Sequence, residues 1–157
     1  MKNLILTTAL MALAAPAFAA GDHAGGHGDE MAVGTPGKAA DVDRTVEVTM
    51  VETEDAEMLF ETDDMTFEKD ETIRFVITNT GDLEHEFVLD TSGEIEEHKA
   101  VMEEFPDMEH DDPNALRLEP GETGEIVWTF ANDGAFEYAC LIPGHYESGM
   151  HGPLVVN

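Results

Sequence analysis

Alternation of apolar and polar residues is the main pattern in this chain. Val46, Val48 and Met50 alternate with polar residues, and the same period of two returns in Ile73–Ile77 and Phe87–Leu89. A period of two is typical of a strand with one buried face. Similar short segments predict further strands at Met65–Phe67, Glu125–Phe130, Ala135–Ala139 and Gly152–Val156.

Turn residues separate these segments, which favours many short strands over a few long elements. The clearest turn signals are Asn79-Thr80-Gly81, Glu119-Pro120-Gly121 and Asn132-Asp133-Gly134. One segment, Glu94–Phe105, predicts a helix, and Pro106 should end it. We find no internal repeat. The pattern predicts an all-β fold, an antiparallel β-sandwich with one short helix in a long connection.

The first 43 residues lack this periodicity. Residues 1–19 have the layout of a cleavable export signal, with Lys2, an apolar run and the small-residue sequence Ala17-Phe18-Ala19. Cleavage after Ala19 would leave a mature protein with no segment long and apolar enough for membrane insertion. Residues 20–43 are rich in Gly, Ala, Asp and His and predict a flexible arm. Residues 44–157 should then form one folded domain.

The charge balance is strongly acidic. The chain has 35 Asp and Glu against 7 Lys and Arg, for a formal net charge of −28. Such a surface repels nucleic acid and anionic lipid, so neither is an expected partner. The charge is consistent with steering a basic partner, and equally with solubility or adaptation to a salty habitat.

The chain has a single cysteine, Cys140, so an intramolecular disulfide is excluded. A lone thiol in an exported protein is either a small buried hydrophobe or a metal ligand or reactive group. The segment from Cys140 to Met150 also contains His145, and so places a thiolate, an imidazole and a thioether on one loop. Soft sulfur together with imidazole is the ligand set that copper selects.

A fourth ligand must come from elsewhere, and His85 is the candidate. It follows the Asn79–Gly81 turn and opens an alternating strand that a sandwich can bring beside the last loop. The expected site has His85, Cys140 and His145 as ligands and Met150 as a weak axial ligand.

These spacings resemble a known motif. Asn79-x-Gly81-x-x-x-His85-Glu-Phe, followed by Cys140-x4-His145-x4-Met150-x-Gly152, resembles the copper motif of the cupredoxin superfamily. Two further segments, residues 105–114 and 136–150, resemble the periplasmic CopI-like cupredoxins associated with bacterial copper tolerance. The resemblance implies a Greek-key sandwich, one type 1 copper and residence in the periplasm.

Enzymes with cupredoxin motifs need a second, open copper site and usually a second domain. This chain has no His-x-His element, and Leu141 stands where oxidases place a histidine that passes electrons onward. We therefore expect no enzymatic activity. Two functions remain open: copper tolerance, which the resemblance favours, and soluble electron transfer to a redox protein partner such as a respiratory or copper enzyme.

Additional copper ions are a weaker hypothesis. On the arm, His23 and His27 would bind copper loosely, or they belong to a solvated linker. His98 and Met102 share a face of the predicted helix, and Met108 and His110 follow Pro106. These residues predict either a second copper site or an ordinary amphipathic helix and acidic loop, and the second interpretation is favoured.

Overall fold

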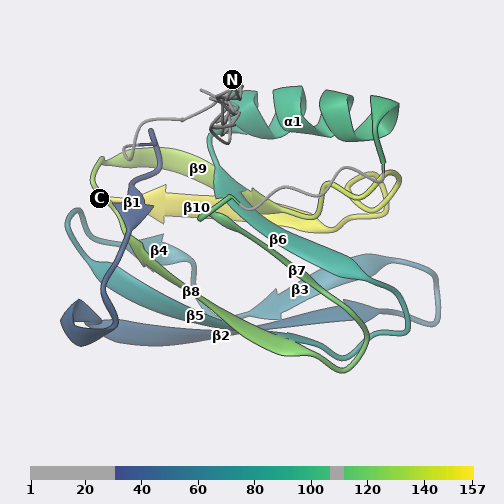
Figure 1. Cartoon of the computed structure of the whole chain (residues 1–157), viewed down its shortest axis with the longest axis horizontal. Helices are drawn as coiled ribbons and strands as arrows, with labels where there is room; N and C mark the ends of the chain where they lie inside the picture. The colour runs from purple at the N-terminus through teal and green to yellow at the C-terminus, as the bar shows by residue number, and fades with distance from the viewer. Residues whose placement is uncertain (1–30, 107–111) are drawn as a thin grey trace, which may run out of the picture.

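Two five-stranded sheets pack face to face in the computed structural model, which describes residues 31–106 and 112–157 (Figure 1). The first sheet consists, in spatial order, of β1 (Thr35–Pro36), β8 (Thr123–Thr129), β5 (Thr72–Asn79), β2 (Arg44–Glu52) and β3 (Met58–Thr62). The second sheet consists of β4 (Thr66–Phe67), β10 (His151–Val156), β9 (Gly134–Ala139), β6 (His85–Asp90) and β7 (Ala115–Leu118). The predicted β-sandwich is confirmed.

The sheets are mixed rather than purely antiparallel, which corrects the sequence-based expectation. β2 pairs in parallel with β5, and β4 pairs in parallel with β10. Between β2 and β5 the chain passes through β3 in the first sheet and β4 in the second. This crossover returns β5 beside β2 in the same direction, a relation that residue periodicity does not reveal.

The sandwich core is aromatic and lies between the two sheets. The Phe67 and Phe130 rings stack with centroids 4.7 Å apart, and the Phe75 ring lies 5.7 Å from that of Phe87. Trp128 is also fully buried. Aromatic side chains each bury a large apolar area, so this cluster supplies much of the force that holds the sheets together.

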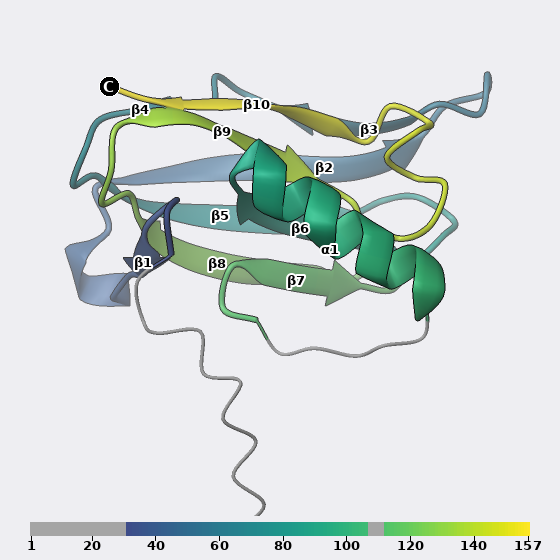
Figure 2. The same ribbon diagram turned by 90° about the horizontal axis from the view of Figure 1, so that it is seen from above.

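Strand β6 is buried on both faces. Phe87 and Leu89 point into the sandwich core, whereas Val88 belongs to a second apolar cluster on the outer face. The helix α1 (Ser92–Glu104) covers that face, and Figure 2 shows it lying across the second sheet. The second cluster consists of Val88, Ile95, Met102, Ala139 and Leu141.

The predicted helix is confirmed, with its start two residues earlier than expected. The hydroxyl of Thr91 accepts a hydrogen bond from the backbone N–H of Glu94 at 3.2 Å, which satisfies one of the free donors of the first turn. Phe105, predicted as the last helical residue, is the C-cap.

Three strands were not predicted. β3 begins with Met58, Leu59 and Phe60, a continuous apolar run in which every side chain is half-buried, so no alternation marks it. β1 has two residues and β7 has four, too few for a period of two to stand out.

The folded part of the chain begins before Arg44, the predicted boundary. Val33 is fully buried, and its carbonyl accepts a hydrogen bond from the indole N–H of Trp128 at 3.3 Å. Residues 35–36 pair with β8, and Ala39–Asp41 form a short 3-10 helix. Residues 31–43 thus pack on the sandwich, although their Gly- and Ala-rich composition predicted a flexible arm. The rest of that predicted arm and the predicted export signal lie outside the described residues.

Among residues 31–106 and 112–157, α1 is the only α-helix, and no helix there has the length and apolar character needed to cross a bilayer.

Met102 gives a direct test of how α1 is held. Its side chain is fully buried under the helix, so Met102→Ala should lower the free energy of unfolding by about 2–5 kcal/mol. Met102→Leu, which nearly conserves volume, should cost less than about 1.5 kcal/mol. Urea denaturation measures both values. Equal stability of the Ala variant and the wild type would contradict the described packing.

Candidate metal centre

His85 reaches the interior because a buried asparagine fixes the turn that precedes it. The side-chain amide of Asn79 donates to the carbonyl oxygens of Leu83 at 2.7 Å and Leu118 at 3.0 Å. Its carbonyl oxygen accepts from the backbone N–H of Gly81 at 3.0 Å. Asn79 is fully buried, so these bonds are costly to break. They hold the connection from β5 to β6, and His85 is the first residue of β6.

The other candidate ligands lie on the loop between β9 and β10. The backbone N–H of Cys140 donates to Met150 O at 3.0 Å, and that of Met150 donates to His145 O at 3.1 Å. Gly144 and Gly149 have φ angles of 89° and 103°, a region that favours glycine. The loop therefore closes on itself, with tight turns at the two glycines.

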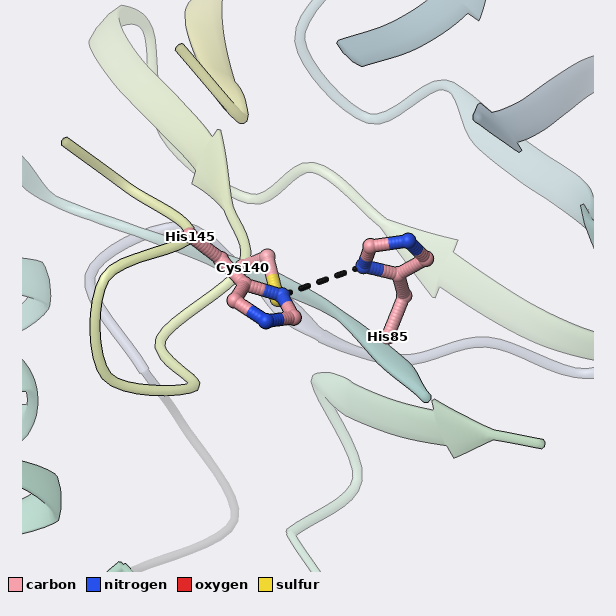
Figure 3. Close-up of side chains that lie close together, drawn as sticks. All are labelled: His85, Cys140 and His145. Atoms are coloured by element: carbon pink, nitrogen blue, oxygen red, sulfur yellow. Dashed lines mark hydrogen bonds between the residues drawn. The ribbon is translucent and has the colours of Figure 1, made fainter. Parts of the chain in front are cut away.

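Three donor atoms meet inside the sandwich, as Figure 3 shows. His85 Nδ1 lies 3.1 Å from His145 Nδ1, and Cys140 Sγ lies 3.4 Å from the same His145 atom. All three donors lie within 4.8 Å of one another, and all three residues are buried. Nitrogen and sulfur ligands of zinc lie about 2.0–2.3 Å from the ion, so donors at this spacing can share one first-row metal ion.

Met150, the predicted axial ligand, is fully buried in the same core cluster as Cys140. Its backbone bonds to Cys140 and His145 keep it next to both residues along the loop. Two imidazoles, one thiolate and a thioether are the donor set that favours copper in electron-transfer sites. The residues present therefore fit copper.

Burial sets the protonation of the metal-free site. It raises the pKa of the Cys140 thiol to about 12, although backbone N–H groups of Glu86 and Ile142 partly oppose the shift. It also lowers the pKa of His145 to about 4, assisted by the neighbouring His85. At neutral pH the metal-free thiol thus keeps its proton and the His145 imidazole is neutral. Metal binding must displace the thiol proton, so affinity rises with pH.

The sulfur atom also has a backbone donor. Glu86 N–H lies 3.3 Å from Cys140 Sγ. Because Glu86 follows His85 directly, the strand that supplies one ligand also orients another. A hydrogen bond to a thiolate favours its charged form.

Glu52 is a residue of this site that the sequence analysis missed. It ends β2, and its Oε1 lies 2.5 Å from His85 Nε2. Burial acts to raise its pKa, but hydrogen bonds from Asp82, His85 and Leu83 outweigh burial and lower it. The available signal was the register: Val46, Val48 and Met50 point inward, and Glu52 continues the same alternation.

The ligand loop is also held against α1. Lys99 Nζ lies 3.0 Å from Glu147 Oε1 and 4.6 Å from the centre of the Tyr146 ring. The Tyr146 hydroxyl donates to Glu137 Oε1 at 2.6 Å, and the His151 ring stacks on Tyr146 at 4.0 Å. His151 is thus a packing neighbour outside the cluster of donor atoms.

The described residues contain one group of His, Cys, Asp and Glu that could hold a metal, namely His85, Cys140 and His145. Met102 is fully buried in the apolar cluster under α1, which also contains Leu141. Its helix neighbour His98 is half-buried. This burial is consistent with the amphipathic-helix interpretation, and a second copper site at His98 and Met102 stays a prediction. The remaining candidates, His23, His27, Met108 and His110, lie outside the described residues.

Comparison with known proteins gives matches over the same region. Residues 46–157 match the family model described as copper binding proteins, plastocyanin/azurin family. The chain is 45% identical to the copper-resistant cuproprotein CopI of Rubrivivax gelatinosus, over 99% of each chain. It is 34% identical to CopI of Pseudomonas aeruginosa, over 80% of this chain and 82% of that one.

Solved structures support the fold. Auracyanin B superposes with a TM-score of 0.58 at 24% identity, covering 79% of this chain and 96% of that one. Together with the donor cluster, the family match shows that His85, Cys140 and His145, with Met150, form a type 1 copper site.

Cys140→Ser should remove the intense thiolate-to-copper absorption band, because a hydroxyl does not supply the soft, charged sulfur donor. The fold should persist, since strands β9 and β10 on either side hold the loop. Visible absorption after copper addition and far-UV circular dichroism measure the two properties. A folded Ser variant that kept the band would refute the assignment of Cys140.

Met150→Leu should retain copper, because an axial thioether is a weak ligand. The reduction potential should rise, because the loss of one ligand that donates an electron pair destabilises Cu(II) more than Cu(I). Redox titration followed at the visible band tests this. Complete loss of copper from a folded variant would mean that Met150 is a principal ligand.

Proposed function

The chain belongs to the plastocyanin/azurin family of copper-binding proteins, and we propose that it binds copper in the periplasm and protects the cell against excess copper. The observation that carries this proposal is the likeness to the copper-resistant cuproprotein CopI, which extends over 99% of both chains. A match of that extent includes the N-terminal residues as well as the copper domain.

The arrangement of the site suits copper handling without substrate turnover. The site is built from four protein ligands, and two of the histidine and cysteine side chains, His85 and Cys140, are fully buried. A catalytic copper needs an open coordination position. Leu141, which follows Cys140, is packed in the apolar cluster under α1. That position therefore provides no histidine for passing electrons to a second copper within this chain.

Export supports the periplasm as the compartment. The N-terminal sequence has the layout of a secretory signal that ends at Ala19. A copper protein in the periplasm can bind the metal before the metal enters the cytoplasm. Protection against excess copper would be most useful at that stage.

A soluble electron carrier is the second candidate function. An alignment of 50 positions, which covers 29% of this chain, is 42% identical to auracyanin-B of Chloroflexus aurantiacus. A site of this geometry also suits outer-sphere electron transfer. A redox protein partner would then be required, and the acidic surface would favour a basic one.

Growth of a deletion strain in rising copper concentrations separates the two functions. We expect deletion of the gene to lower copper tolerance, and the wild-type gene to restore it. Cys140→Ser should fail to restore tolerance although the protein reaches the periplasm, because the site can no longer hold copper as a thiolate complex.

The carrier function makes the opposite prediction. The deletion strain would tolerate copper as well as the parent does, and it would respire or grow more slowly at low copper. That result would contradict the copper-tolerance proposal.

A further inference from the structure

The two nitrogen atoms of the His85 ring have different neighbours. Nδ1 faces the donor cluster, 3.1 Å from His145 Nδ1, and Nε2 lies 2.5 Å from the Glu52 carboxylate. Histidines that bind metals commonly donate their second N–H to a carboxylate, a carbonyl or water. Such a bond fixes the tautomer, because the proton on Nε2 leaves Nδ1 with a free lone pair.

The carboxylate of Glu52 is itself held in place. Its Oε2 accepts from the backbone N–H of Asp82 at 2.7 Å, and its Oε1 accepts from that of Leu83 at 3.1 Å. Both donors belong to the turn that delivers His85 to the start of β6. The carboxylate therefore connects three parts of the site: the end of β2, the turn and the histidine ring.

Gly81 makes room for this contact. A Cβ atom at residue 81 would collide with both carboxylate oxygens of Glu52. The glycine of the Asn79-x-Gly81 motif thus has a steric role here, because its backbone angles do not require glycine.

Placing an acidic side chain at this position has a cost. Glu52 occupies an inward-facing position of β2, and 19% of its side chain is exposed. A poorly solvated carboxylate is unfavourable unless hydrogen bonds replace the lost water. The Asp82, Leu83 and His85 donors supply such bonds. A side chain that only filled space at this position would not need these three hydrogen bonds.

We propose that Glu52 is a positioning residue of the copper site, which presents His85 Nδ1 to the metal and whose negative charge favours Cu(II) over Cu(I). The inference rests on the copper site described above. A carboxylate bonded to a ligand histidine makes that ligand more basic. A more basic ligand, and a nearby negative charge, both stabilise the more highly charged ion.

Glu52→Gln is the decisive variant because it keeps the size and one oxygen acceptor but removes the charge. Changes of this kind alter metal affinity by about 10–100-fold. We expect the preference for Cu(II) over Cu(I) to fall about tenfold, a rise of about 59 mV in the one-electron reduction potential. Glu47→Gln is the matched control, since Glu47 lies on the same strand, is exposed and carries the same charge.

Gly81→Ala gives an independent test that leaves Glu52 in the chain. Its new methyl group should displace the carboxylate from His85, and the potential should rise in the same direction as in Glu52→Gln. Nitrogen-15 NMR of the metal-free proteins adds a readout without copper: the wild-type His85 ring should carry its proton on Nε2. This tautomer preference should weaken in Gly81→Ala.

The outcomes separate this inference from the copper site itself. If Glu52→Gln and Gly81→Ala keep the potential of Glu47→Gln while the wild type shows its copper band, the role of Glu52 is refuted and the copper site stands. If the wild type shows no copper band, both are refuted. If Glu52→Gln does not fold, the potential of Gly81→Ala decides the question.

Discussion

The copper site depends on the pairing of β6 with β9 in the second sheet, which brings His85 beside the Cys140–Met150 loop although the two are far apart in the sequence. His85 and His145 are 60 residues apart, yet their Nδ1 atoms lie 3.1 Å from each other. Each ligand segment is fixed separately, one by the buried Asn79 and the other by backbone bonds within the Cys140–Met150 loop. The protein thus holds its donors close together before any metal is bound, and copper need not organise them.

Burial of the ligands makes charged side chains unfavourable in the metal-free site. Burial raises the pKa of Cys140 to about 12 and lowers that of His145 to about 4, so both groups are neutral near pH 7. A bound metal ion supplies the positive charge that stabilises a buried thiolate. Glu52 adds one negative charge at the outer edge of the site, where the Asp82 and Leu83 N–H groups stabilise it. Burial therefore disfavours a charged Cys140 unless a metal ion is bound, whereas hydrogen bonds stabilise the charge of Glu52.

The ligand set could be predicted from the sequence because three of its members lie on one loop with spacing that suits a single ion. Most strands could also be predicted, since alternation persists wherever a strand has one buried face. β3 could not, because its half-buried side chains show no alternation. The packing of residues 31–43 was missed because it depends on Trp128, about 95 residues away. Glu52 was missed for the same kind of reason, since its partner His85 lies on another strand.

Copper titration of the mature wild-type protein, followed by visible absorption, tests whether the chain holds one type 1 copper. We expect an intense thiolate-to-copper band that grows linearly and reaches its maximum at one equivalent of copper, because His85, Cys140 and His145 form one preorganised site. A protein that binds copper without this band, or that needs two or more equivalents to develop it, would contradict the assignment of one copper to His85, Cys140 and His145.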